Sequence, residues 1–266
     1  MGTIMATFVS IIIIKIKILF KMNDTSIIIP LYNEEIRIDY CFDIIIKLLK
    51  KKEKKFKEII FVNDGSTDKS KNKVLKFIKR VKRKNFNTKL KLISYSKNRG
   101  KGYALKRGIL SSKSDWILTC DLDMSVLPEQ YLIWSRRKLI KDINYAYIAS
   151  RNHKKSKIKS KFLRRRLGDI FRLILFILFN IRILDTQCGF KVYHKNYAKY
   201  LFKKMKITRY VHDVEIILIL KNIGIIVKEL PVKWKHRSSS KINIITDSLK
   251  MLLDLFILRL RLSLND

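Results

Sequence analysis

Short runs of β-branched apolar residues alternate with longer helix-like segments through the first half of the chain. Strands are expected at 26–30, 58–63, 89–95, 116–120 and 145–150. Helices are expected between them, at 34–51, 66–81, 102–111 and 128–139. This alternation is typical of an α/β domain whose mostly parallel sheet is covered on both faces. The chain has 266 residues, which suits one such domain with short appendages.

Acids and amides gather where the expected strands stop. They are Asn33, Glu34 and Glu35 after the first strand, Asn63, Asp64 and Asp68 at the second, and Asp121 and Asp123 after the fourth. Any one group has a simpler explanation, because acids favour helix N-termini and Asp-Gly-Ser forms turns. Three groups at the ends of separate strands favour a ligand site, because ligands of parallel sheets bind beyond the carboxyl ends of the strands.

Asp121 and Asp123 flank Leu122, so on an extended backbone their carboxylates point to the same side. Two hard oxygen ligands suit Mg²⁺ or Mn²⁺, which takes few carboxylates and completes its shell with phosphate oxygens. Such an ion would neutralise charge on a departing diphosphate. A solvated loop with two acids is the simpler alternative.

The segment 98–102, Asn-Arg-Gly-Lys-Gly, follows the third strand and opens a helix. Its two glycines allow close approach of a ligand, and the helix N-terminus with Arg99 and Lys101 favours phosphate. The segment is neither G-x-G-x-x-G nor a Walker sequence, so neither a Rossmann dinucleotide site nor a P-loop is indicated.

Charge indicates the class of partner. Lys and Arg total 59 against 22 acidic residues, a formal charge of +37, so anionic partners are expected. A nucleic-acid-binding protein is one interpretation, but the acidic strand ends would repel that ligand, and basic residues interleaved with aromatics on one face would be required. Three cysteines without a Cys-x-x-Cys pair disfavour a disulfide framework or a zinc site and indicate a reducing compartment.

In the second half of the chain, a basic segment is followed by two segments rich in apolar residues. Residues 151–166 are rich in Lys, Ser and Arg, residues 167–184 predict a very apolar helix, and residues 242–264 predict an amphipathic one. Both helices are either core elements or helices that lie in a membrane interface. Residues 4–20 form an apolar run, close to the length of about 20 that a spanning helix needs. The run lacks a small-residue cleavage site, which disfavours a signal peptide.

Read together, the motifs resemble those of the GT-A domain of family-2 glycosyltransferases. The resemblance rests on Tyr-Asn-Glu-Glu at 32–35, Val-Asn-Asp-Gly-Ser-Thr-Asp at 62–68, Asn-Arg-Gly-Lys-Gly at 98–102 and Asp-Leu-Asp at 121–123. Three further motifs narrow it to the dolichyl-phosphate β-glucosyltransferases, with polyprenyl-phosphate mannosyltransferases as close relatives. They are Asp-Thr-Gln-Cys-Gly-Phe-Lys at 185–191, Asp-Val-Glu at 213–215, and Pro-Val-x-Trp at 231–234 followed by Ser240 and Lys241.

The resemblance covers residues 26–261 and implies a domain plan. Residues 1–25 would be an apolar extension or anchor. Residues 26–241 would form the GT-A domain, in which 151–184 supply a basic acceptor segment and an apolar helix. Residues 242–266 would form a C-terminal amphipathic helix, so that the α/β domain carries membrane-interface helices at its C-terminal end.

The resemblance also implies roles for individual residues. The nucleotide-sugar would be bound by Pro30, Tyr32, Glu34, Asp64, Lys101, Gln187 and Lys241. The catalytic centre would contain Asp121, Asp123, Arg151 and Asp185, with Asp121 and Asp123 on Mg²⁺ or Mn²⁺. The acceptor phosphate would meet Arg151, Arg164 and Arg165. Related mannosyltransferases carry a metal-binding Gln where this chain has Ser125. Asp213 and Glu215 stand where many family-2 enzymes have a catalytic carboxylate, and a structural or acceptor-positioning role is the alternative.

The implied reaction transfers one sugar, glucose from UDP-glucose, to a polyprenyl or dolichyl phosphate with inversion. A phosphate acceptor has its second pKa at about 6 and needs no dedicated base. The alternatives are a GDP-mannose-dependent polyprenyl-phosphate mannosyltransferase, a transferase for another acceptor, and an inactive scaffold, which the intact Asp121 and Asp123 argue against. The enzyme would lie on an anionic membrane surface, with its catalytic domain on the cytosolic face of a bacterial inner membrane or the endoplasmic reticulum, and would not bind nucleic acid.

Overall fold

The computed structural model describes residues 24–51, 56–159, 162–235 and 244–263. The first half contains β1 (Thr25–Leu31), α2 (Ile38–Lys50), β2 (Phe56–Asp64), α3 (Ser70–Lys82), β3 (Lys89–Tyr95), α4 (Lys101–Ser111), β4 (Trp116–Thr119), α5 (Glu129–Arg136) and β5 (Tyr145–Ser150). The second half contains β6 (Lys157–Lys159), α6 (Phe162–Phe179), β7 (Lys191–His194), α7 (Lys195–Lys204), α8 (His212–Asn222), β8 (Ile226–Pro231), β9 (Lys233–Lys235) and α9 (Ile244–Ser263). The expected strand and helix alternation is therefore present. The extension 1–25 lies outside the described residues, apart from its last two.

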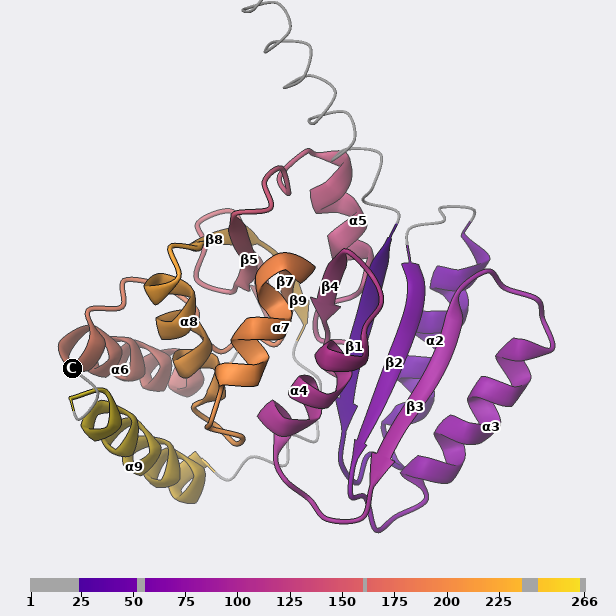
Figure 1. Ribbon diagram of the computed structural model, residues 1–266, viewed down its shortest axis with the longest axis horizontal. Helices are drawn as coiled ribbons and strands as arrows, with labels where there is room; N and C mark the ends of the chain where they lie inside the picture. Colours follow the sequence, from indigo (N-terminus) through magenta and orange to yellow (C-terminus); the bar gives the residue numbers. More distant parts are fainter. Residues whose placement is uncertain (1–23, 52–55, 160–161, 236–243, 264–266) are drawn as a thin grey trace, which may run out of the picture.

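The central sheet has seven strands in the order β3-β2-β1-β4-β7-β5-β8 (Figure 1). Strand β7 runs antiparallel to β4 and β5, and the other neighbouring pairs are parallel. The mostly parallel α/β fold is thus confirmed. Because β7 runs in the opposite direction, it begins at the edge where β4 and β5 end. A separate parallel pair joins β6 to β9.

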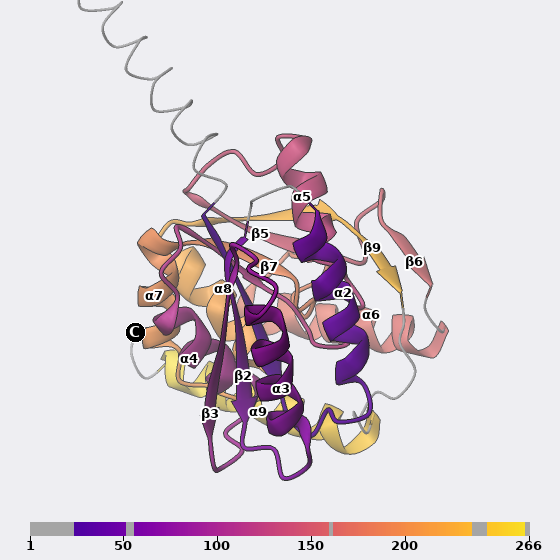
Figure 2. The same ribbon diagram turned by 90° about the vertical axis from the view of Figure 1, so that its right-hand side faces the viewer.

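Helices cover both faces of this sheet (Figures 1 and 2). On one face α2, α3 and α5 pack in a cluster that includes the stacked rings of Phe42 and Phe77, with centroids 4.0 Å apart. On the other face α4, α7 and α8 pack against the strands. Gly108 lets α4 lie close, because a Cβ there would come within 2.4 Å of the Ile28 side chain. Each fully buried large apolar side chain contributes about 1.5–3 kcal/mol to folding.

A third apolar cluster joins α6, α8 and α9 at the end of the molecule farthest from α3. Helix α6 begins at Phe162, before the predicted start at residue 167. The arginines of this segment are good helix formers, but they leave no apolar period from which a helix could be predicted. It ends before residue 184, because Asn180 adopts a left-handed φ of 50°. Among the described residues, no helix combines the length and apolar character needed to cross a bilayer.

Candidate active site

The loops that follow β1 and β2 are tied together at the carboxyl edge of the sheet. The backbone N–H groups of Asn33 and Glu34 donate to the hydroxyls of Ser66 and Ser70, over 2.9 and 2.7 Å. In return, Asn33 Oδ1 accepts from the Thr67 N–H at 2.8 Å. Since these polar groups bond across the two loops, α2 and α3 each begin four residues later than the pattern predicted. The ties hold the two loops as one surface.

Asp64, at the end of β2, organises the next loop. One carboxylate oxygen accepts from the Arg99 N–H at 2.8 Å, and the other accepts from the Asn98 side chain and the Gly100 N–H, each at 2.9 Å. Gly100 has a φ of 98°, and a Cβ there would lie 2.4 Å from the Thr208 carbonyl oxygen. Asp64 therefore fixes the turn that opens α4.

Three other residues expected to bind the nucleotide lie nearby. Tyr32 follows β1 and is 40% exposed, while Pro30 belongs to the strand itself. The Glu34 carboxylate is held by the guanidinium of Arg37, at 2.5 and 2.7 Å. Pro30, Tyr32, Glu34 and Asp64 thus share one edge of the sheet, beside the loop that opens α4.

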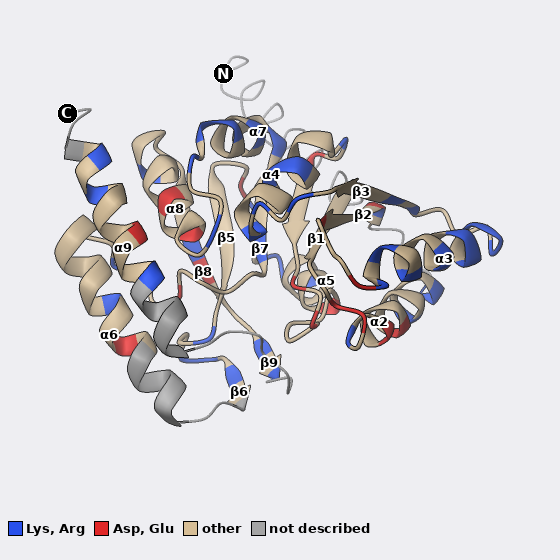
Figure 3. Cartoon of the chain, turned by 90° about the horizontal axis from the view of Figure 1, so that it is seen from below, with Lys and Arg blue, Asp and Glu red and all other residues tan. Residues whose placement is uncertain are grey.

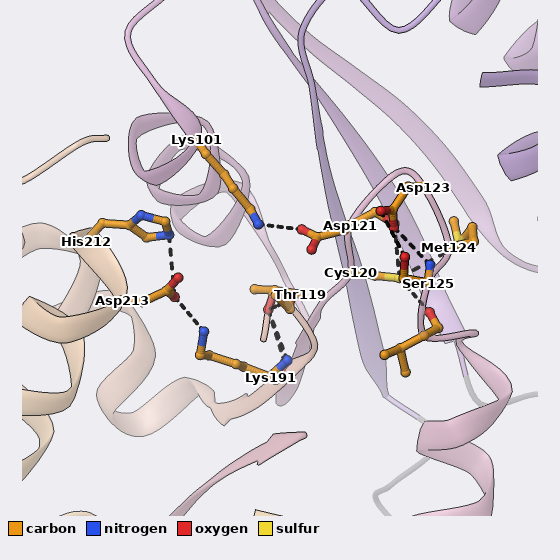
Figure 4. A network of polar contacts seen from close by, with 12 residues as sticks. Lys101, Thr119, Cys120, Asp121, Asp123, Met124, Ser125, Lys191, His212 and Asp213 are labelled. Atoms are coloured by element: carbon orange, nitrogen blue, oxygen red, sulfur yellow. Dashed lines mark hydrogen bonds and ion pairs between the residues drawn. The ribbon is translucent and has the colours of Figure 1, made fainter. Parts of the chain in front are cut away.

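Lys101, the first residue of α4, reaches across to the acid that follows β4. Its Nζ lies 2.5 Å from Asp121 Oδ1 (Figure 4). Burial lowers the pKa of Lys101, but Asp121 and Asp213 raise it by more, so this pKa lies above its usual range. Gly189 lies beneath the same carboxylate, where a Cβ would come within 2.3 Å of Asp121 Oδ2. The Asp121 carboxylate thus lies between the Lys101 ammonium group and the backbone of Gly189.

Asp123 is oriented by its own loop. Ser125 donates to it from both the backbone N–H and the hydroxyl, each at 2.9 Å. The expected Mg²⁺ or Mn²⁺ would be held by Asp121 and Asp123, which both lie on the short loop that follows β4 (Figure 4). Within the described ranges no three His, Cys, Asp or Glu residues form a ligand cluster. The oxygen-only pair fits an ion that takes one or two carboxylates and completes its shell with substrate phosphate and water.

Arg151 and Asp185 meet where β5 ends and β7 is about to begin. The guanidinium donates to both carboxylate oxygens, at 2.7 and 2.8 Å, and the Arg151 backbone N–H donates at 2.8 Å. Burial raises the pKa of Asp185, but the hydrogen bonds from Arg151 lower it by more, so this carboxyl stays ionised. The Arg151 side chain is 36% exposed and lines a pocket with Asp121, Gln187 and Trp234.

The two acids at the start of α8 hold structural contacts. Glu215 accepts from the backbone N–H groups of Lys206 and Ile207, at 3.0 and 2.6 Å. Asp213 is buried and lies 2.5 Å from Lys191 Nζ (Figure 4). Burial raises the pKa of Asp213, but the charges of His212, Lys191 and Lys101 lower it to about 2. Burial lowers the pKa of His212 below its usual value.

The structure describes most of the predicted site residues, but not all of them. Asp64, Lys101, Asp121, Arg151 and Asp185 come to the same edge of the sheet. The side chains of Arg164 and Arg165, at the start of α6, and the whole of Lys241 lie outside the described residues.

Sequence reasoning gave no role to Gly189, Lys191 or Trp234. Lys191 stands among the apolar residues Phe190, Val192 and Tyr193, and this is a detectable signal, because a buried cation needs a charged partner. Gly189 and Trp234 carry no such signal, because their partners come from other strands.

Comparison with known proteins identifies the family. The sequence pattern of Glycosyl transferase family 2 matches residues 26–202. Dolichyl-phosphate beta-glucosyltransferase of Dictyostelium discoideum is 33% identical over 248 residues, 89% of this chain and 74% of that protein.

Two solved structures share the fold. Mannosyl-3-phosphoglycerate synthase from Rubrobacter xylanophilus has a TM-score of 0.61 at 17% identity, over 91% of this chain and 75% of that one. A mannosyltransferase from Pyrobaculum calidifontis, in complex with GDP-Man and Mn²⁺, has a TM-score of 0.53 at 16% identity, over 82% and 58% of the two chains. The chain belongs to glycosyl transferase family 2 and is a glycosyltransferase.

Proposed function

We propose that the protein transfers a single glucose from UDP-glucose to dolichyl phosphate or a related polyprenyl phosphate, with inversion at the anomeric carbon. The observation that carries this proposal is the pocket in which Arg151 lies beside Asp121 and Gln187. A cation that contacts both a donor diphosphate and an acceptor phosphate is what a sugar transfer to phosphate needs. The name of the Dictyostelium relative supports glucose and dolichyl phosphate.

The donor lies along the edge formed by β1, β2 and β4. Pro30, Tyr32, Glu34 and Asp64 line the nucleotide end of the site, where Tyr32 offers an exposed ring for stacking. Lys101 stands between this end and the sugar end, and it moves from Asp121 to the diphosphate when the donor binds. Gln187 and Asp185 border the sugar. Lys241, which lies outside the described residues, is assigned to the donor diphosphate in this proposal.

The acceptor phosphate approaches from the side of β5 and β7. Arg151 presents guanidinium N–H groups in a plane fixed by its paired hydrogen bonds to Asp185, and Arg164 and Arg165 supply further positive charge. The phosphate oxygen is the nucleophile, and it attacks the anomeric carbon as the diphosphate departs. A phosphate monoester is largely ionised near neutrality, so no side chain has to remove its proton. The ion pair of Asp213 with Lys191 agrees with this, because a carboxylate held anionic at 2.5 Å from a cation is a weak base.

Asp121 and Asp123 would hold Mg²⁺ or Mn²⁺ in this proposal, and the ion would supply positive charge beside the leaving diphosphate. The Mn²⁺ in the complex of the Pyrobaculum mannosyltransferase supports a divalent ion at this fold. Ser125 fixes the Asp123 carboxylate, and Gly189 leaves room for that of Asp121.

The experiment combines each donor with each acceptor. Purified protein is incubated with labelled UDP-glucose or labelled GDP-mannose, with dolichyl phosphate, with dolichol or without lipid, and the organic phase is counted. Label is expected in the organic phase only with UDP-glucose and dolichyl phosphate. Transfer from GDP-mannose alone would replace the proposal with the mannosyltransferase alternative. Transfer to dolichol would overturn the phosphate acceptor. The enzyme is expected on the cytosolic face of a membrane of the endoplasmic reticulum or of a bacterial cell.

A further inference from the structure

The first turn of α4 is covered by residues 205–211, which join α7 to α8 and are called the α7–α8 segment. In this segment the carbonyl oxygen of Thr208 accepts from the backbone N–H groups of Gly102 and Tyr103, at 2.8 and 3.4 Å. N–H groups in the first turn of a helix have no partner within the helix. These two therefore donate to the protein's own backbone and not to the phosphate expected at this turn.

Two glycines let the α7–α8 segment come this close. A Cβ at Gly100 would lie 2.4 Å from the Thr208 carbonyl oxygen, and a Cβ at Gly102 would lie 2.8 Å from His212 Cβ. A side chain at either position would therefore push the segment away from α4. Helices α4, α7 and α8 lie next to one another on one face of the sheet (Figures 1 and 3). The glycines that were expected to admit a ligand thus admit this segment.

Glu215, in the first turn of α8, holds the α7–α8 segment from its other side. The side chain is buried, and its two carboxylate oxygens accept from the backbone N–H groups of Lys206, at 3.0 Å, and Ile207, at 2.6 Å. Hydrogen bonds to a carboxylate are stronger than those between neutral groups. Ile207 itself packs in the apolar cluster of α6, α8 and α9. Glu215 therefore fixes the peptide groups that immediately precede Thr208.

The same contacts fix the backbone from which Lys101 extends. Lys101 lies between the two glycines and is the first residue of α4. Its Nζ reaches Asp121 Oδ1 at 2.5 Å (Figure 4). Where this ammonium group can go depends on where the first turn of α4 lies. A displacement of about 1 Å at such a group can slow a reaction about 100-fold.

We propose that Glu215 positions Lys101 for the donor diphosphate, acting through the α7–α8 segment and the first turn of α4. The inference rests on the proposed function, because that function assigns Lys101 to the diphosphate of UDP-glucose. Glu215 is then a positioning residue and not a base. Both of its carboxylate oxygens accept from backbone N–H groups, which leaves them badly placed to remove a proton from a substrate.

The first test follows amide hydrogen exchange in the full chain without ligand, by nuclear magnetic resonance. Glu215→Gln places an NH₂ group, which cannot accept, against one of the two donating backbone groups. Exchange at Gly102 and Tyr103 is expected to become about tenfold faster, the equivalent of one hydrogen bond. Exchange at Leu105 and Ile109, farther along α4, is expected to keep the wild-type rate. Equal acceleration along the whole helix would indicate a loss of global stability and would contradict the positioning role.

Glu229→Gln is the matched control. Glu229, on β8, also accepts from two consecutive backbone N–H groups, those of Leu184 and Asp185, at 2.9 and 3.1 Å. It holds the residues before β7 and not the α7–α8 segment. The variant is expected to leave both the exchange at Gly102 and the affinity for UDP at wild-type values. The same change in both variants would mean that loosening anywhere near the site has this effect, and the assignment to Glu215 would be wrong.

The second test measures the affinity for UDP by titration calorimetry in the presence of Mn²⁺. Lys101→Met and Glu215→Gln are each expected to weaken UDP binding about tenfold, because each loses a hydrogen bond to a charged group or its placement. The double variant is expected to bind UDP as Lys101→Met alone does, because residues that act through one another are not additive. Additive losses would show that Glu215 does not act through Lys101.

The two tests also separate this inference from the proposed function. A protein that binds GDP in place of UDP, with exchange at Gly102 and the non-additive pair as expected, would refute the UDP donor and uphold the positioning role. UDP binding that depends on Lys101 but not on Glu215 would refute the positioning role alone. Wild-type exchange and UDP affinity in Glu215→Gln, together with a collapsed kcat, would identify Glu215 as a base.

Discussion

At the scale of single residues, each charged group of the site has a partner that fixes its direction. Asp121 is paired with Lys101, Arg151 with Asp185, and Asp123 with Ser125. Groups held in place before the substrate arrives stabilise a developing charge without reorganising, which is the main source of electrostatic catalysis. The two aspartates were predictable from Asp-x-Asp at a strand end. The pairing of Arg151 with Asp185 required the antiparallel β7, which sequence spacing does not reveal.

Asp123→Asn is expected to lower the transfer rate about 100-fold or more while the thermal unfolding temperature stays close to that of the wild type. The amide keeps the shape and an acceptor for Ser125 but loses the negative charge needed for a divalent ion. Ser125→Ala is the matched variant, because the Asp123 carboxylate stays but loses the hydrogen bond from the Ser125 hydroxyl. Its transfer rate is expected to fall about tenfold. An Asp123→Asn protein that works at full rate in the presence of a chelator contradicts the metal role.

Gly189→Ala is expected to slow transfer about 10- to 100-fold, because its Cβ would come within 2.3 Å of Asp121 Oδ2 and displace the carboxylate. Steady-state rates should show the loss mainly in kcat. The control is Gly168→Ala on α6, where a Cβ meets nothing within 4 Å. Equal activity of the two variants would show that the close approach at Gly189 does not matter.

At the scale of elements, the buried pair of Lys191 and Asp213 joins β7 to α8. Both side chains are at most 9% exposed. A paired buried charge of this kind specifies how two elements meet, and removal of one partner leaves an uncompensated charge. Sequence patterns predicted the strands of the first half well, because each carries its own apolar run. They gave no strand for β7, because its four residues include a lysine and a histidine whose partners lie on other elements.

The Asp213 pair predicts a pH dependence of stability. The pKa of this carboxyl is lowered from 3.8 to about 2 in the folded protein, so its stabilising effect is full above pH 4 and is lost as the pH falls toward 2. The free energy of unfolding is expected to fall by about 2 kcal/mol more in the wild type than in Asp213→Asn between pH 5 and pH 2. Urea unfolding at a series of pH values measures this difference. Parallel curves for the two proteins would contradict it.

At the scale of the whole molecule, the sheet order brings together groups that are far apart in the chain. The parallel strands β1, β2 and β4 bring Pro30, Asp64 and Asp121 to one edge, and the reversed β7 brings Asp185 and Gln187 beside Arg151. The fold class was predictable from local patterns, and so was the approach of Asp64 and Asp121 to one edge of the sheet, because parallel strands end at a common edge. The hydrogen bonds that join the first two loops were not predictable, because they depend on tertiary contacts.

In the proposed reaction, a lipid phosphate attacks the anomeric carbon of glucose in one displacement. The most direct measurement is the anomeric configuration and linkage of the lipid product, determined by nuclear magnetic resonance after reaction of UDP-α-glucose with dolichyl phosphate. A β-linked glucosyl phosphate is expected, because one displacement inverts the α configuration of the donor. An α-linked product, or glucose joined through anything other than the lipid phosphate, would contradict it.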